Sequence, residues 1–491
     1  MPSRALRSLG CVVLFALVAC HGGKGASHPG APLAYPATRW IPGDATYAVT
    51  ARRSRDAAIV LRDLVAVVGM IGDFDERDAS RGAMKELGFD PFDPTTFGAV
   101  GVDPDGGLAV FSQGLSPTFA IALTDPATTT AAIDRLRQGG IAVQVGREQG
   151  VEVYTFAGDR EVHVHWAIAD KWLFVHIEIR PEHEAELAWF RALRAADGAW
   201  AGSPDLAASL AAARTGGPDA PTVIGAVRLP AVLAKMVALG APRGCADQLG
   251  AVGRIFVAAR SDARDARGSI AVELAGGIPA DATFAAPAGW ATARDQAPLQ
   301  AEWGIDLDRV VPRLLACDAG LGRELARLPV KAGRAYVHSL DLDDLDGRGA
   351  AWVATREPRM VADMLDEIPA RSLAEHKRTA HGVPVVDVSV PMLPKFSYVL
   401  GQGTFLGAAG GGEIDRVIGD GTTQPAALAR IAVAPQAWPV ELWDELFKAA
   451  GLSREGARGR TIARLRRWTL GEIELSTTAT GVILTAHGAR K

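Results

Sequence analysis

An internal repeat with a constant spacing of 232 residues is the feature that most constrains the fold. The segments "PTFAIALTDPATTTAAIDRL" around Pro126 and "GRGAAWVATREPRMVADML" around Pro358 each predict a strand followed by a helix that begins near the proline. The same shift carries Gly150-Val151 onto Gly382-Val383. A single register that continues through about fifty residues predicts two copies of one structural unit.

Two further echoes extend the repeat. "IPGDATYAV" at residue 41 returns as "IPADATFAA" at 278, and "GRIFVAARSDARDARGSIAVELA" resembles "GEIELSTTATGVILTAHG" near the C-terminus. Each copy then contains antiparallel hairpins interrupted by helices. This order predicts an α+β fold made of two tandem duplicated domains, each an antiparallel sheet with helices on one face.

The length of 491 residues also favours more than one domain. We expect the first domain at 39–277 and the second at 278–491. A signal peptide is expected at 1–19 and a flexible tether at 20–38, where glycine, proline and small polar residues are frequent.

The N-terminus carries the most specific motif. Arg4 and Arg7 precede an apolar run from Leu9 to Ala19, which has the length of a signal-peptide core and is too short to span a bilayer. The run ends in Leu17-Val18-Ala19-Cys20, which resembles the bacterial lipobox. The resemblance implies that Cys20 becomes the first mature residue and carries lipid. An ordinary secretory signal that happens to contain a cysteine is the alternative.

These features predict a protein of the cell envelope, held by its lipid at the periplasmic face of the outer membrane. The membrane is the partner that the anchor implies, and a protein or lipid partner stays unidentified. A net charge of only -4 gives no support for binding nucleic acid.

Two cysteines remain after the signal and the lipid site. Cys245 and Cys317 can form a disulfide in an oxidising compartment, or they can be two separate buried thiols. Their spacing does not decide between these alternatives.

The stretch "LGFDPFDPTTFGAVGVDPDGG", together with the order of the elements, resembles an uncharacterised family of extracytoplasmic bacterial domains. The resemblance implies a location outside the cytoplasm. It brings no catalytic motif.

The segment "HVHWAIADKWLFVHIE" predicts a hairpin with a two-residue turn at Asp170-Lys171. The pleat then places two sets of side chains on opposite faces. One set, expected in the core, is Trp166, Ile168, Leu173 and Val175. The other set, expected on the solvent face, is His163, His165, His176 and Glu178.

Three histidines and a glutamate form a ligand set suitable for a metal ion with an open position. The 232-residue shift, however, replaces the histidines by Lys395, Ser397 and Ala408, so the hairpin does not need histidine to fold. The sequence therefore favours a solvated strand face with no metal or cofactor, and the metal site is kept as the alternative.

No G-x-S-x-G, P-loop or C-x-x-C motif occurs in the chain. We therefore predict a lipid-anchored envelope protein without catalytic activity, which acts by binding or assembly. One alternative is a metal-binding protein or metal-dependent enzyme that uses His163, His165 and His176. A second is a carrier that holds an acyl chain between sheet and helices.

Overall fold

The computed structural model divides into two compact units. Unit 1 comprises residues up to Ala241 and Val252–Glu273, and unit 2 comprises Pro242–Ala251 and Leu274–Lys491. The residues described are 35–59, 61–62, 76–138, 143–157, 162–179, 188–195, 198–215, 221–240, 243–261, 264–278, 283–287, 289–290, 297–309, 311–312, 320, 323, 326–327, 330–341, 346–356, 374–389, 395–401, 403–419, 422–423, 428–449 and 455–490.

Several predictions concern residues outside these ranges. The signal peptide, Cys20 and nearly all of the tether precede the first described residue, Tyr35. Cys317 and the side chain of Cys245 are also outside them, so the question of a disulfide stays open.

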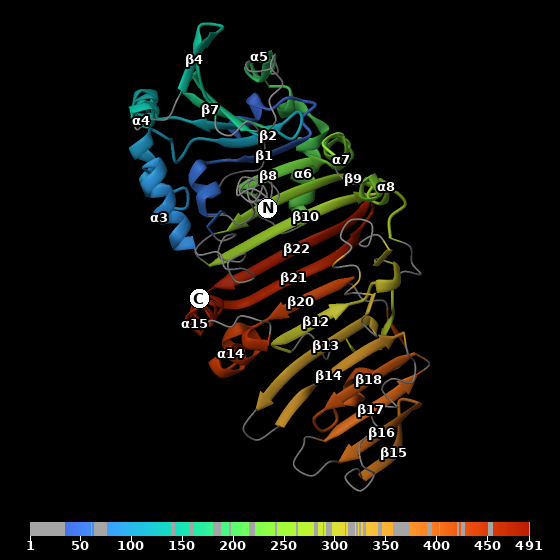
Figure 1. Ribbon diagram of the computed structural model, residues 1–491. Helices are drawn as coiled ribbons and strands as arrows, with labels where there is room; N and C mark the ends of the chain where they lie inside the picture. The colour runs from blue at the N-terminus through green and yellow to red at the C-terminus, as the bar shows by residue number, and fades with distance from the viewer. Residues whose placement is uncertain are drawn as a thin grey trace. The chain divides into compact units, whose positions relative to one another are not determined.

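Among the described residues, ten antiparallel strands belong to unit 1. Their hydrogen-bonded order is β10, β9, β8, β1, β2, β3, β7, β6, β5, β4. Figure 1 shows β2, β1, β8, β9 and β10 one after another in this sheet. The bounds are β1 Tyr47–Ala51, β2 Leu108–Ser112, β3 Thr118–Ala122, β4 Val143–Glu148, β5 Val151–Ala157, β6 Val162–Ala169, β7 Trp172–Ile179, β8 Val223–Arg228, β9 Val252–Ser261 and β10 Asp265–Leu274.

Unit 2 has the same order of strands, namely β22, β21, β20, β12, β13, β14, β18, β17, β16, β15. The bounds are β12 Leu299–Trp303, β13 Val330–Asp341, β14 Asp346–Thr355, β15 Ala374–Ala380, β16 Val383–Ser389, β17 Phe396–Gly401, β18 Thr404–Ala409, β20 Ala429–Val433, β21 Trp468–Thr478 and β22 Gly481–Arg490. A small separate sheet pairs β11, Ala286–Pro287, with β19, Thr422–Thr423.

The 232-residue offset holds in the hydrogen-bond register of four strand pairs. Thr118 of β3 faces His176 of β7, and 232 residues later Ala350 of β14 faces Ala408 of β18. The pairs β4–β5, β5–β6 and β6–β7 match β15–β16, β16–β17 and β17–β18 in the same way. The two segments therefore share strand order and register. The helix expected after Pro358 lies outside the described residues.

The tight turns also recur at this offset. Gln149-Gly150, between β4 and β5, has φ values of 50° and 81°. His381-Gly382, between β15 and β16, has φ values of 50° and 75°. Two consecutive positive φ values are typical of the type I′ turn, whose twist suits a two-residue hairpin. This explains why glycine occupies the second turn position in both copies.

One of the sequence echoes does not align equivalent strands. The echo at 41 contains β1, which pairs with β2 and β8. The strand with the same two neighbours in unit 2 is β12, which begins at Leu299 and pairs with β13 and β20. The echo at 278 lies about twenty residues before it. Short similarities of this kind predict an element less well than a register that continues through several strands.

The predicted α+β class, with helices layered on one face of each sheet, is wrong. Antiparallel sheet dominates the described chain, since twenty strands are assigned to it, ten from each unit. The main helix-to-strand contacts are those of α6 (Pro204–Thr215) with β8 and β9, α7 (Leu229–Ala238) with β8 and β9, and α13 (Glu413–Ile418) with β14 and β18. A local pattern predicts that a helix forms but not what the helix packs against. That is the physical reason for the error.

The described residues include further α-helices, namely α3 Glu76–Leu87, α4 Pro126–Gln138, α5 Ala188–Ala195, α8 Arg243–Gln248, α14 Val440–Ala449 and α15 Glu455–Leu465. Residues 54–59 and 61–62 are also helical. The 3₁₀ helices described are η2 Pro36–Trp40, η3 Pro94–Val100, η4 Trp200–Gly202 and η7 Pro435–Ala437. Among the described residues no helix has the length and apolar character needed to cross a membrane.

Candidate functional site

The hairpin formed by β6 and β7 has the register that the sequence predicts. His165 faces His176, and His163 faces Glu178. The turn residues Asp170 and Lys171 have φ values of 50° and 62°, as a two-residue turn requires. The predicted turn and cross-strand pairs are therefore confirmed.

The predicted burial of the two faces is wrong, because the histidine face is the more deeply buried one. His165 is 0% exposed, while His176 and Glu178 are each 9% exposed. On the opposite face Trp166 and Val175 are only half-buried. The sequence assigned the apolar face to the core because it contains large hydrophobic side chains, but segments distant in the sequence decide which face is covered.

Two such segments cover the histidine face. Trp40 of η2 packs edge-to-face on Phe174, with ring centroids 4.9 Å apart, and Phe190 of α5 lies 6.4 Å from the same ring. Ala167 and Ala120 are both 0% exposed and flank Phe174 on the neighbouring strands. These small side chains leave room for the aromatic rings of η2 and α5.

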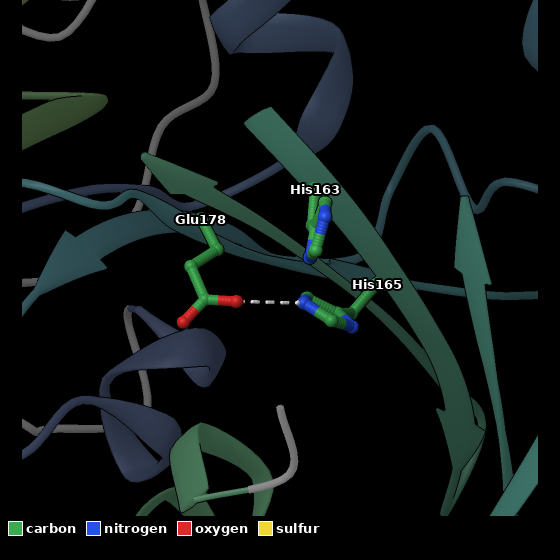
Figure 2. Close-up of side chains that lie close together, drawn as sticks. All are labelled: His163, His165 and Glu178. Atoms are coloured by element: carbon green, nitrogen blue, oxygen red, sulfur yellow. Dashed lines mark hydrogen bonds and ion pairs between the residues drawn. The ribbon is translucent and has the colours of Figure 1, made fainter. Parts of the chain in front are cut away.

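Three potential metal ligands converge on this buried face. His163, His165 and Glu178 each offer one nitrogen or oxygen atom, and these atoms all lie within 4.8 Å of one another. Figure 2 shows that the two imidazoles project from β6 and the carboxylate from β7 toward a common point. The structure thus brings three of the four predicted candidates together.

His165 is held on both sides by hydrogen bonds. Its Nε2 lies 3.2 Å from Oε2 of Glu178, and its Nδ1 lies 3.0 Å from the hydroxyl of Thr155. An ionised carboxylate only accepts, so Nε2 carries the hydrogen and donates it to Glu178, while Nδ1 accepts from Thr155. With a metal ion on Nε2, the ring hydrogen would instead reside on Nδ1 and be donated to the hydroxyl of Thr155 of β5, which is how outer partners orient metal-binding histidines. Sequence reasoning did not identify Thr155, although the repeated β5–β6 register places it opposite His165.

His163 has no such support. Its Nδ1 is buried, and no hydrogen-bond partner for it occurs among the described residues. Its ring centroid lies 6.2 Å from that of His165. A buried polar atom without a partner costs free energy of the order of 1–3 kcal/mol, so a native structure that keeps one calls for an explanation.

The fourth candidate, His176, is engaged elsewhere. Its Nδ1 lies 2.9 Å from the hydroxyl of Thr118, and its ring stacks on Trp189 of α5 at 5.2 Å. Burial, together with the charge that His165 would carry, lowers the pKa of His176 to about 3. Its imidazole is therefore neutral near pH 7. A small cavity of about 170 Å³ extends beside His176, Thr118 and Trp189.

This low pKa predicts a pH dependence of stability for the metal-free protein. Between pH 6.5 and about 3 the unfolded chain binds a proton at this residue and the folded chain does not. Lowering the pH through this range therefore favours unfolding, by roughly 1.4 kcal/mol per pH unit. We expect His176→Asn, which retains a polar group near Thr118 but does not titrate, to show a shallower slope. Urea unfolding in the presence of a chelator at several pH values measures both slopes, and parallel slopes would contradict the assignment.

The corresponding position in unit 2 is polar but has different chemistry. Ser397 and Asp387, the counterparts of His165 and Thr155, are joined by a hydrogen bond of 2.6 Å. Asp387 also pairs with Arg378 at 2.7 Å, and Arg378 reaches Asp415 at 2.6 Å. Both units therefore keep a cross-strand polar pair at this place. Only unit 1, within the described residues, surrounds it with potential metal ligands.

The donor set indicates the class of ion. Two imidazoles and one carboxylate suit zinc, copper, nickel and cobalt, whereas magnesium and calcium prefer oxygen ligands alone. Zinc bonds of about 2.0–2.1 Å at tetrahedral angles place ligand atoms about 3.3 Å apart. The separation of 3.2 Å between His165 and Glu178 already matches this value. The ligand atom of His163 lies within 4.8 Å of both.

Comparison with known proteins adds no further constraint. The chain matches no family model, no curated protein and no solved structure. The function must therefore be argued from the geometry of the site.

Proposed function

We propose that this chain is a lipid-anchored protein of the cell envelope that binds one divalent transition-metal ion through His163, His165 and Glu178. The proposed activity is binding without a chemical step, in keeping with the lack of a catalytic motif in the sequence. The fourth coordination position is left for water or for a group on a partner.

The observation that carries this proposal is the buried Nδ1 of His163, for which the described residues supply no partner, beside the paired ligands His165 and Glu178. In this proposal Nδ1 of His163 is the ligand atom, so that a bound cation supplies its partner and also offsets the cost of burying the carboxylate of Glu178. His165 and Glu178 pair with each other already, so without an ion His163 has no evident reason to be histidine.

A metal titration with matched variants tests the proposal. The full-length chain, purified in detergent and freed of metal, is titrated with Zn²⁺ against a chromophoric chelator. We expect one ion per chain for the natural protein and none for His163→Leu. His376→Leu, which removes an exposed histidine of β15, is the matched control and should bind as the natural protein does.

The stability of the metal-free His163→Leu variant shows whether His163 serves as a metal ligand or is needed for the fold itself. Leucine has no buried polar atom to satisfy, so we expect the melting temperature of this variant to equal or exceed that of the metal-free natural protein. Zn²⁺ should raise the melting temperature of the natural protein and of His376→Leu but not that of His163→Leu, because a ligand that binds only the folded state stabilises it. Stoichiometric binding that survives His163→Leu would refute the proposal.

The location is a separate part of the proposal. If Cys20 carries the lipid, Cys20→Ser should move the protein from the membrane fraction to the soluble fraction, because the acyl chains attached to Cys20 would be lost. Cys11→Ser, within the apolar run of the signal, is the matched control and should leave the protein in the membrane fraction. Membrane association that persists in Cys20→Ser would argue against the lipobox.

A further inference from the structure

A second cavity in unit 1 is separate from the metal site. It has a volume of about 260 Å³ and is bounded by side chains of β1, β2, β3 and β8, by the helical residues 54–59 and 61–62 and by the segment 89–97. Phe119 and Ile121 of β3 line it, whereas Thr118 and Ala120 of the same strand pair with His176 and Phe174 of the histidine face. Because side chains alternate along a strand, the cavity and the metal site lie on opposite faces of β3.

The side chains that line this cavity are almost all apolar. The lining consists of valine, alanine, leucine, isoleucine, phenylalanine and proline, with one serine. That residue, Ser54, donates its hydroxyl hydrogen to the carbonyl oxygen of Gly106 at 3.2 Å. Its hydrogen is thus already used within the protein. A polar ligand group placed here would lose its hydrogen bonds to water without replacement.

Size and chemistry together identify the occupant. An apolar cavity of about 150 Å³ holds a benzene molecule, so 260 Å³ corresponds to roughly ten carbon atoms. This is less than a whole drug-sized ligand requires, but it suits the unbranched tail of a larger amphiphile. Leu61 lines the cavity, and the next residue in the chain, Arg62, is exposed and carries a positive charge.

We propose that this cavity binds a single saturated acyl chain and leaves the polar head in solvent. The chain is inserted between the sheet and the helical residues 54–59 and 61–62, and the head group contributes little beyond its charge. Both a free fatty acid and a single-chain phospholipid carry such a chain, and the experiment separates these two sources.

The experiment measures the affinity of the full-length protein for hexanoate, octanoate, decanoate and dodecanoate by calorimetry below their micellar concentrations. We expect each added methylene to strengthen binding about four-fold up to roughly ten carbons and little beyond that length. Dodecanoyl lysophosphatidylcholine is the second probe. Binding of the fatty acids that depends on their length supports the proposal and indicates that the acyl chain belongs to a free fatty acid. Binding of the lysophospholipid but not of the fatty acids also supports the proposal and indicates that the acyl chain belongs to a membrane lipid.

Two variants locate the binding. Ala57→Leu fills part of the cavity and should weaken decanoate binding at least ten-fold, whereas Ala99→Leu, an exposed site on η3, should not change it. A thermal melt shows whether Ala57→Leu folds, and the length series on the natural protein tests the proposal even if it does not. Affinity for all probes that does not depend on chain length, or full affinity in a folded Ala57→Leu, would overturn the proposal.

Discussion

Glu178→Gln is expected to weaken Zn²⁺ binding by more than about 100-fold while the hairpin stays folded. Changes to residues that only orient metal ligands already cost 10–100-fold in affinity, so loss of a charged ligand should cost more. Glutamine has nearly the same shape and keeps a carbonyl oxygen that can accept the hydrogen of His165 Nε2. The variant therefore removes the charge and leaves the packing. The chelator competition described above measures the change.

The matched control for this variant is Glu148→Gln on β4. Glu148 pairs with Arg191 at 3.3 Å, away from the three ligands, so this change alters the net charge equally without touching the site. We expect unchanged zinc affinity in the control. Equal affinity losses in the two variants would mean that the overall charge of unit 1 controls binding, and this result would argue against Glu178 as a ligand.

Phe174→Ala is expected to destabilise unit 1 by about 3–5 kcal/mol, which is the usual cost of truncating a fully buried phenylalanine. Phe174 is 0% exposed and lies in ring contact with Trp40 and Phe190. Its removal would leave a cavity among rings that come from three separate segments. The midpoint of urea unfolding, followed by tryptophan fluorescence, measures the loss.

Val145→Ala on β4 serves as the control, because Val145 is 49% exposed and its truncation should change stability by less than about 0.5 kcal/mol. This comparison also tests the corrected burial of the two hairpin faces. If the face of Phe174 were solvated, as the sequence suggested, both variants would show small effects of similar size.

The sequence predicted local geometry well in the repeated region. The turn at Asp170-Lys171 and the pairing of His165 with His176 follow from turn chemistry and alternation, both of which act within a hairpin. The constant offset also transfers strand register from one copy to the other, as with Val383, where β16 begins as β5 does at Val151. These features depend on residues that are near each other in the chain.

Burial could not be predicted from the same information. Both faces of the β6–β7 hairpin contain residues that fit a core, since Ala167 and Phe174 share a face with the histidines. Which face is covered depends on Trp40 and Phe190, which come from η2 and α5. Nothing in the hairpin encodes their position. The prediction of the fold class was wrong for a related reason. A helical sequence pattern does not indicate how much of a sheet the helix covers.

The candidate site was only partly visible in the sequence. The alternation of β6 and β7 correctly gathered the three histidines and Glu178 on one face. The division of roles, with His165 oriented by Thr155 and His176 engaged by Thr118 and Trp189, depends on neighbouring strands and on α5. That no described residue is a hydrogen-bond partner of His163 Nδ1 can be seen only in the folded chain.

X-ray absorption at the zinc edge of the metal-loaded full-length protein tests the metal site most directly. We predict a first shell of nitrogen and oxygen scatterers at about 2.0–2.1 Å, with the outer-shell pattern of two imidazoles and with no sulfur. A sulfur shell at about 2.3 Å would place the ion on a cysteine instead. Such a shell, or a first shell without imidazole, would contradict binding by His163, His165 and Glu178.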